Sequence, residues 1–327
     1  MSTQCPNVET LFLEARKQDI EFEKNERIDY GSDKNVYKVQ LNAGFVYAAK
    51  VYSNSDAEVK MFTRESKIVN DIITVSRDYL TCFSGTLTYT NSNGQLEHWL
   101  ITEYLKDYIS LHDAVTNNTA MDYAEIYVDM IEGLKVLHDA GVSHQDINPN
   151  TILVNTKTNR IKYIDFALAC MDENCERPNR KITQYSAPEA LLDKQIYLSM
   201  AKKADMWSLG CVIFSCEHKN QLPLSKDEVF DYNNTFSHAA TFSDDKTYLD
   251  AIMKIKNSGI MLLSTFERNN SASFKFERNC ISFDLTFLIN MDFSKRNLEK
   301  CYKKPLRWHM KSMLKKFTFQ TKPTPSE

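Results

Sequence analysis

Short runs of alternating apolar and polar residues occupy much of the first hundred positions of the chain. Alternation of this kind is typical of β-strands that bury one face. A different spacing interrupts these runs at 56–73, where apolar residues recur about every three or four positions and predict a helix. The expected strands lie within Ile28–Val39, which also contains a turn, and within Val46–Val51, Tyr79–Tyr89 and His98–Tyr104.

A long amphipathic helix is predicted over Met121–Ala140, where five apolar residues share one face. These are Ile126, Met130, Ile131, Leu134 and Leu137. The apolar runs that follow are short. Ile152–Val154 and Ile161–Ile164 flank the turn-rich residues 155–159, so we predict two strands joined as a hairpin.

A carboxylate brackets each strand of this hairpin, with Asp146 before the first strand and Asp165 after the second. Pairing of the strands would bring both acids to one end of the hairpin. Two acids at one edge of a small sheet suit a site that binds a cation and activates a hydroxyl group.

The stretch from His144 to Ala167 resembles the catalytic loop and the metal-binding loop of eukaryotic-type protein kinases, which read H-R-D-L-x-x-x-N and D-F-G. Asp146 and Asp165 match the two acids of these patterns, whereas the arginine, the asparagine and the last glycine are replaced. The later matches are Ala187-Pro188-Glu189, the helix with Asp205, Trp207, Ser208 and Gly210, and Arg296. Small-molecule phosphotransferases share the two loops but do not usually carry these later features together.

The resemblance implies an α+β, bilobal protein-kinase-like fold. It implies a small lobe with a five-stranded β-sheet and one helix, and a larger, mainly α-helical lobe. The kinase-like domain would cover residues 22–308, divided at about 104/105, with a lead-in at 1–21 and a tail at 309–327. The resemblance also implies that Asp205 holds the catalytic-loop backbone and that Arg296, in a last core helix within 284–301, pairs with Glu189.

Lys50 lies in the apolar run AAKV, where a buried ammonium group needs a partner. The alternative is a lysine whose stem is buried and whose charge reaches solvent. Glu65 is the expected partner and Glu58 the second choice. By the resemblance, the Lys50–Glu65 pair positions the α- and β-phosphates of ATP, Asp146 accepts the proton of the substrate hydroxyl, and Asp165 binds Mg²⁺.

The resemblance also implies a nucleotide pocket in which main-chain groups of Glu103 and Leu105 bind adenine. The full set of expected nucleotide contacts is Ile28, Gly31, Val36, Ala48, Lys50, Glu103, Leu105 and Leu153. Gly31 is the one glycine that survives of the family's three, because Asp29 and Lys34 take the other two positions. Side chains obstruct the approach of backbone N–H groups to phosphates, so we expect a stiffer or partly obstructed cover over the phosphates.

Four further departures bear on activity. Thr151 replaces the asparagine that holds a second metal ion; its hydroxyl can ligate Mg²⁺ but is a weaker donor, and Asn150 could serve only if the loop shifts. Asn148 replaces the lysine that stabilises the transferred phosphoryl group, and Ile182 replaces its usual threonine neighbour, although Thr183 is adjacent. Gln145 replaces the arginine that grips a phosphorylated activation loop, so activity is expected not to depend on loop phosphorylation.

Two functions of different class follow from this pattern. The first is a protein kinase of low activity that transfers phosphoryl from MgATP to a serine or threonine hydroxyl of a protein. The second is a pseudokinase that binds nucleotide or a protein partner without turnover. The enzyme is favoured because all four charged positions, Lys50, Glu65, Asp146 and Asp165, persist. A small-molecule phosphotransferase is a more distant third reading.

The composition of the chain limits which kinds of binding partner are expected, but it does not bear on the reaction. Apolar residues make up 43% of the 327 positions and the net charge is −3, so nothing in the bulk charge favours nucleic acid or a membrane as a partner. We expect a protein substrate or a regulatory protein. The eight cysteines form no C-x-x-C pair, and neither a signal peptide nor a membrane span is recognisable. These features predict free thiols in a reducing, intracellular and cytoplasmic setting.

Overall fold

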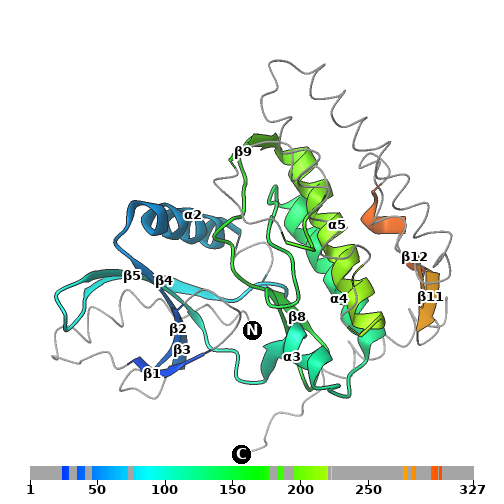
Figure 1. Ribbon diagram of the computed structural model, residues 1–327, viewed down its shortest axis with the longest axis horizontal. Helices are drawn as coiled ribbons and strands as arrows, with labels where there is room; N and C mark the ends of the chain where they lie inside the picture. The colour runs from blue at the N-terminus through cyan, green and yellow to red at the C-terminus, as the bar shows by residue number, and fades with distance from the viewer. Residues whose placement is uncertain are drawn as a thin grey trace, which may run out of the picture.

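The computed structural model describes residues 24–28, 35–40, 46–72, 77–176, 183–187, 195–219, 222, 275–278, 281–284, 296–300 and 302–303, and the structural statements below concern these residues alone. They form two lobes (Figure 1). A β-sheet with one helix forms the smaller lobe, and three further helices pack in the larger one. The predicted lead-in at 1–21 and tail at 309–327 lie outside the described residues.

The small lobe contains one antiparallel five-stranded sheet with strand order β1-β2-β3-β5-β4. Its strands are β1 (Lys24–Arg27), β2 (Asn35–Gln40), β3 (Val46–Ser53), β4 (Phe83–Thr90) and β5 (Leu96–Glu103). The predicted five-stranded sheet is therefore confirmed, although the first strand was predicted to begin at Ile28 and β1 lies wholly before that residue. In the register of this sheet, Lys50 lies opposite Val36 on β2 and Leu100 on β5. Lys50 is therefore on the central strand of the sheet.

Among the described residues of the small lobe, helix α2 (Asp56–Ile72) is the one helix, as predicted. Its buried residues are Glu65, Ile68, Val69 and Ile72, which recur at helical spacing. Three of them are ordinary core residues. The fourth, Glu65, is a carboxylate that is only 2% exposed, and such a group requires partners inside the protein.

The large lobe is organised around α4 (Tyr123–Asp139) and α5 (Leu198–Glu217), which lie side by side in Figure 1. The Asp122 carboxylate caps α4 by accepting hydrogen bonds from the backbone N–H groups of Ala124 and Glu125. Both helices bury residues on most of their circumference, which is typical of central helices. The short helix α3 (Leu111–Thr116) precedes them.

The predicted hairpin is confirmed as β7 (Ile152–Asn155) and β8 (Ile161–Tyr163), which pair antiparallel. A third strand, β6 (Tyr108–Ser110), pairs with β7 on its other side. The hairpin brings residue 151 and residue 164 to the same end, because Ile152 lies opposite Tyr163. The two acid-bearing loops therefore leave the sheet beside one another.

Several strands in the large lobe were not predicted. β9 (Asn174–Glu176) pairs with β10 (Gln195–Tyr197), and β11 (Lys275–Arg278), β12 (Ile281–Asp284) and β13 (Tyr302–Lys303) form a small sheet. We predicted a last core helix within 284–301, and the structure describes only the two ends of this range. The prediction is wrong at both ends. Asp284 ends strand β12, and residues 298–300 form a short 3₁₀ turn. The lobe is therefore less uniformly helical than expected.

The prediction of free thiols is wrong for part of the cysteines. Cys170 and Cys175 form a disulfide, and Cys82 is disulfide-bonded as well. Cys211 and Cys216 are free thiols, as predicted. The sequence pattern failed here because spacing along the chain does not report which loops fold back on themselves.

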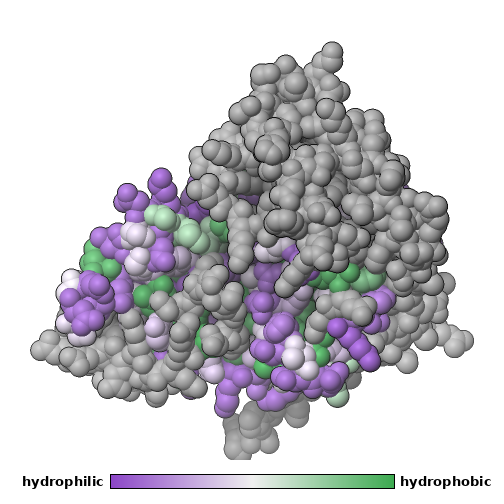
Figure 2. All heavy atoms as spheres, viewed as in Figure 1, coloured by the Kyte–Doolittle hydropathy of each residue, from purple (hydrophilic) through white to green (hydrophobic). Residues whose placement is uncertain are grey.

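Most of the coloured surface in Figure 2 is hydrophilic, with scattered apolar residues over the small lobe. Among the described residues, the large apolar side chains that are exposed are Leu96 and Tyr197. None of the helices in this part of the chain is both long and apolar enough to cross a bilayer.

The ring of Tyr79, from the segment between α2 and β4, packs against α4 at Gly133. A Cβ atom on Gly133 would lie 2.7 Å from Cδ1 of Tyr79 and 3.1 Å from Cε2 of Tyr163. Overpacking of this kind typically costs about 1–3 kcal/mol, which exceeds the gain of about 1 kcal/mol in helix propensity from glycine to alanine. Gly133→Ala is therefore expected to lower the free energy of unfolding, as measured by urea denaturation.

A double-mutant cycle identifies the cause of that loss. In a Tyr79→Ala background, the ring that opposes the new methyl group is absent, so Gly133→Ala should cost less than in the wild type. An equal cost in both backgrounds would contradict this account of Gly133.

Candidate active site

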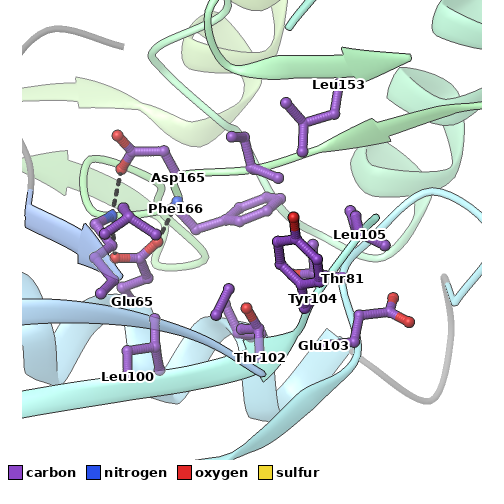
Figure 3. Close-up of a pocket in the computed structure, with 15 residues that line it drawn as sticks. Glu65, Thr81, Leu100, Thr102, Glu103, Tyr104, Leu105, Leu153, Asp165 and Phe166 are labelled. Carbon is purple, nitrogen blue, oxygen red and sulfur yellow. Dashed lines mark hydrogen bonds and ion pairs between the residues drawn. The ribbon is translucent and has the colours of Figure 1, made fainter. Parts of the chain in front are cut away.

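Six of the predicted nucleotide contacts line one pocket between the lobes. They are Val36, Ala48, Lys50, Glu103, Leu105 and Leu153. Figure 3 shows the pocket with Glu65 and Asp165 at one end and Thr102, Glu103 and Leu105 at the other. Of the other two predicted contacts, Ile28 donates its N–H to the Val36 carbonyl at 2.7 Å without lining the pocket, and Gly31 lies outside the described residues.

Lys50 forms two ion pairs at the charged end of the pocket. Its Nζ atom lies 2.6 Å from Oε2 of Glu65 and 2.8 Å from Oδ1 of Asp165. Burial alone would lower the pKa of Lys50, but the two carboxylates outweigh burial and raise it well above its usual value. The ammonium group therefore stays charged. Glu58, the second choice of partner, instead accepts a hydrogen bond from the backbone N–H of Ser53.

Glu65 joins three elements through one carboxylate. Oε2 binds Lys50 on β3 and accepts a hydrogen bond from the Tyr52 hydroxyl, while Oε1 accepts the backbone N–H of Phe166 at 2.8 Å. Burial, followed by the Glu65 charge, raises the pKa of Tyr52 far above its usual value, so the hydroxyl remains a donor. Helix α2 is thus connected both to the sheet and to the loop after β8.

His144 connects the loop that carries Asp146 with the loop that carries Asp165. Its Nδ1 atom lies 3.2 Å from the backbone N of Asp146, and Nε2 lies 3.0 Å from the carbonyl oxygen of Ile164. Nδ1 must therefore accept and Nε2 must donate, which requires the neutral ring with its proton on Nε2. The side chain is fully buried and its ring centroid is 4.8 Å from that of Phe166. His144 is structural, as predicted.

Asp205 on α5 holds the backbone of this loop from below, as predicted. Its carboxylate accepts the backbone N–H groups of His144 at 2.8 Å and Gln145 at 2.7 Å, and the Ser143 hydroxyl at 2.8 Å. His138 Nε2 is a further partner, at 3.1 Å. Burial would raise the pKa of Asp205, but the hydrogen bonds from His138 and from the backbone of Gln145 hold it below its usual value.

Thr151 fastens the loop around Asp146. Its hydroxyl oxygen accepts the backbone N–H of Asn148 at 3.1 Å and lies 2.6 Å from the Asp146 carbonyl oxygen, to which it donates. The side-chain amide of Asn148 donates to the same carbonyl at 3.2 Å. In this arrangement the Thr151 proton is already used within the loop, and one lone pair of the hydroxyl is left for any metal ion.

Lys162 connects the large lobe to the segment that leads into the pocket. Its Nζ atom lies 2.6 Å from the carbonyl oxygen of Leu80, 3.0 Å from that of Arg77 and 3.1 Å from Oε1 of Glu103. Glu103 in turn exchanges hydrogen bonds with Cys82, through its backbone N–H and through Oε1. These contacts fix the backbone on which the predicted adenine contacts, Glu103 and Leu105, depend.

Seven pocket residues were not among the predicted site residues. They are Val69, Thr81, Leu100, Thr102, Tyr104, Ile164 and Phe166. Leu100 and Thr102 could have been found from strand periodicity, because alternate residues of β5 face the same side. Val69 and Phe166 come from a helix and a loop that only the folded chain brings together.

The remaining predicted interactions fall at the edge of the described residues. Arg296 is completely buried, donates from Nη1 to the Lys203 carbonyl at 2.8 Å, and lies over the Trp207 ring. Its predicted partner Glu189 is outside the described residues, so that ion pair stays a prediction. Gln145 adopts a left-handed backbone conformation with φ of 62° and donates from its side chain to the Leu168 carbonyl at 3.2 Å.

Comparison with known protein families agrees with this arrangement. The sequence profile of the protein kinase domain matches residues 22–299. The chain belongs to the protein kinase family. A solved kinase structure shares the fold: a MAP kinase from Leishmania major, LmaMPK10, aligns with a TM-score of 0.51 and 19% sequence identity over 90% of this chain and 85% of the other. The predicted bilobal kinase fold is therefore confirmed.

Two of the similar curated proteins are named as serine/threonine-protein kinases. The kinase NLK2 of Xenopus laevis is 34% identical over 123 residues, which cover 36% of this chain and 26% of NLK2. The kinase shk1/pak1 of Schizosaccharomyces pombe is 31% identical over 211 residues, which cover 60% of this chain and 30% of that protein. The aligned part thus spans about a quarter to a third of the length of these relatives.

Proposed function

We propose that the chain is a serine/threonine protein kinase of low activity, which binds MgATP between its lobes and transfers the γ-phosphoryl group to a protein hydroxyl. The observation that carries the proposal is the bonded cluster of Lys50, Glu65 and Asp165 at one end of the pocket. A lysine held between a helix carboxylate and a loop carboxylate is arranged to meet phosphate oxygens. The serine/threonine preference rests on the names of the similar kinases.

The residues present fit one Mg²⁺ ion. Mg²⁺ is usually held by one or two carboxylates together with substrate phosphates. Asp165 can supply such a carboxylate, since its side chain is 21% exposed and lines the pocket, whereas Glu65 is already engaged by three donors. Among the described residues no group of three or more potential ligands could hold a metal alone, so the ion would depend on the nucleotide. Thr151 is the proposed further ligand, through its remaining lone pair.

The roles proposed for the protein groups are those that the resemblance to protein kinases implies. Lys50 binds phosphate oxygens, Asp165 holds the metal ion, and Asp146 accepts the proton that leaves the substrate hydroxyl. Bound Mg²⁺ supplies positive charge that stabilises the negative charge on the transferred group. Asn148 contributes no charge where the family has lysine, which is the physical reason for expecting slow turnover. The partners we propose are a protein substrate and regulatory proteins in the cytoplasm.

A pseudokinase is the second candidate. The observation in its favour is that the Thr151 hydroxyl and the Asn148 amide are both bonded to the Asp146 carbonyl, so neither is directed to a ligand. A second metal ion would then be weakly held. The chain would bind nucleotide or a partner without transferring phosphate.

One experiment separates these functions. Thermal unfolding is measured with ATP, with and without Mg²⁺, and phosphoryl transfer to a generic protein substrate is measured in parallel, for the wild type and for Lys50→Met. Stabilisation by MgATP together with transfer, both lost in Lys50→Met, supports the enzyme. Stabilisation without transfer supports the pseudokinase. No effect of nucleotide on the wild type would reject the enzyme and the nucleotide-binding form of the pseudokinase.

Independence from loop phosphorylation is a separate prediction. Thr183 and Ser186 are the described serine and threonine residues shortly before the A-P-E segment, and they bond to each other, with Oγ atoms 3.2 Å apart. Because Gln145 cannot grip a phosphate as arginine does, alanine at both positions should leave turnover unchanged. The measurement is kcat for phosphoryl transfer, before and after phosphatase treatment of the wild type. A large loss in either comparison would contradict the prediction.

A further inference from the structure

The start of the activation segment is closed into a loop by the disulfide between Cys170 and Cys175. We call residues 170–175 the disulfide loop. Cys175 is completely buried and Cys170 is 8% exposed. None of the catalytic roles proposed above uses this bond, so its presence calls for a separate explanation.

Hydrogen bonds tie the disulfide loop to the rest of the large lobe at both ends. Ser143 and Cys170 exchange backbone N–H···O bonds of 2.9 Å, directly before the catalytic loop. At the other end, the backbone N–H of Leu198 donates to the Glu173 carbonyl at 2.9 Å, and Cys175 pairs with Ile196 between β9 and β10. The loop therefore links the catalytic loop to the start of α5, and the disulfide fixes the distance between these two attachments.

A second pocket of the molecule opens onto this disulfide. It lies between α2 and the disulfide loop, and its charged lining residues are Arg64 and Lys67 from α2 and Asp172 from the loop. Cys170 forms part of its wall. Two cations face one anion, so the lining carries a net positive charge. The pocket that contains Lys50 and Asp165 is separate and shares none of these residues.

We propose that this second pocket is a reaction site for a small anionic thiol, of the class of carboxylate-bearing thiol peptides, which reduces the Cys170–Cys175 disulfide. A pocket of positive charge raises the local concentration of an anionic reactant. It also lowers the pKa of a thiol within it and so stabilises a thiolate. Because Cys175 is buried, Cys170 is the sulfur that a small molecule reaches first.

The chemistry balances with two molecules of the thiol. The thiolate of the first attacks Sγ of Cys170, the S–S bond breaks, and Cys175 leaves with the electron pair and takes up a proton. The second thiolate attacks the small-thiol sulfur of the mixed disulfide, so Cys170 leaves with the electron pair and takes up a proton, and an oxidised dimer of the small thiol is formed. The protein is reduced by two electrons and two protons, and the two thiols supply both.

Reduction has a structural consequence in the activation segment. After reduction, the segment between the hydrogen bonds to Ser143 and to Leu198 would be an open stretch of chain, no longer closed by the disulfide. A closed loop restricts the chain more than an open one of the same length. The segment between the attachments should open more often and become accessible to proteases. This inference does not depend on whether the chain transfers phosphate.

The test compares thiols of different charge on the full chain. Glutathione is the anionic probe, 2-mercaptoethanol the neutral one and cysteamine the cationic one. The rate of conversion of the 170–175 disulfide to two thiols is followed by alkylation and peptide mass spectrometry. Each rate is divided by the rate of the same thiol with a small peptide disulfide, which removes differences in intrinsic reactivity.

The expected result is a normalised rate for glutathione about tenfold above that for cysteamine at low salt, as electrostatic attraction of this kind gives. The preference should disappear in Arg64→Gln/Lys67→Gln and at high salt, and should persist in Lys60→Gln, which removes an exposed cation from the same helix. Circular dichroism confirms that each variant is folded. Protease cleavage between residues 168 and 176 should increase after reduction in the wild type.

Three results would overturn the proposal. The first is an equal normalised rate for the three thiols. The second is reduction only under conditions that unfold the protein, measured by the same circular dichroism. The third is that Cys170 and Cys175 remain free thiols after treatment with oxidised glutathione. The same result in Cys216→Ser would show that Cys216 is not responsible.

Discussion

Asp146→Asn is expected to lower the rate of phosphoryl transfer by about 10²- to 10⁴-fold, the usual contribution of a general base. The amide has nearly the same size as the carboxylate but cannot take up the proton of the substrate hydroxyl. Asp146 is not one of the residues that line the nucleotide pocket, and its backbone N–H and carbonyl groups bond to His144 and Thr151. The affinity for MgATP should therefore be unchanged.

Two measurements check this expectation. Single-turnover rates report the transfer step, and the MgATP-induced shift in thermal unfolding reports binding. Asp107→Asn is the matched control, because Asp107 is an exposed aspartate that pairs with Lys157 and does not line the pocket. Transfer at the wild-type rate in Asp146→Asn would show that another group takes the proton or that none is needed.

Asp205→Asn is expected to lower the free energy of unfolding by about 3–5 kcal/mol, the range for loss of one partner in a buried charged network. The carboxylate of Asp205 is 1% exposed and accepts from four groups, three of which meet at Oδ2. In Asp205→Asn, an amide NH₂ group at the Oδ2 position is itself a donor and cannot accept hydrogen bonds from these three groups. Rotation of the amide does not help, because Oδ1 also accepts an N–H, from Gln145.

The loss should depend on pH in a defined direction. The folded-state pKa of Asp205 is below its usual value, which is about 3.9 in an unfolded chain. Its contribution to stability is therefore complete above about pH 4 and is lost as the pH falls through the folded-state pKa. Urea denaturation should show a constant difference between wild type and Asp205→Asn near neutral pH that narrows in acid. Asp107→Asn should show no such difference, and a gap that widens in acid would contradict the assignment.

The parts of the fold that could be predicted are those in which local pattern and burial agree. Helix α4 and the β7–β8 hairpin have clear periods, and each lies within a few residues of its predicted range. The pairing of β9 with β10 could not be predicted, because two three-residue strands carry no recognisable period. The disulfide was missed for a related reason: Cys170 and Cys175 look unremarkable until the chain turns back between them.

The candidate site also contains one part that the sequence could predict and one part that it could not. Lys50 and Glu65 could be predicted to pair, because a charge in an apolar run must find an opposite charge, and they do. The position of Thr151 in the sequence indicated a metal ligand, yet its hydroxyl is used to fasten its own loop. Sequence position identifies which residue stands at a site, whereas the direction of one hydroxyl proton depends on distances of a few tenths of an ångström.

The carboxylate of Glu65 has a consequence for how the small lobe can move. Its three donors come from Lys50, Tyr52 and the backbone of Phe166, and water does not reach it. A slight outward displacement of α2 would leave a desolvated anion with fewer donors, at considerable cost. Only a displacement large enough to hydrate the carboxylate removes that cost. Helix α2 should therefore occupy either of two discrete positions, with a barrier between them, rather than a continuous range.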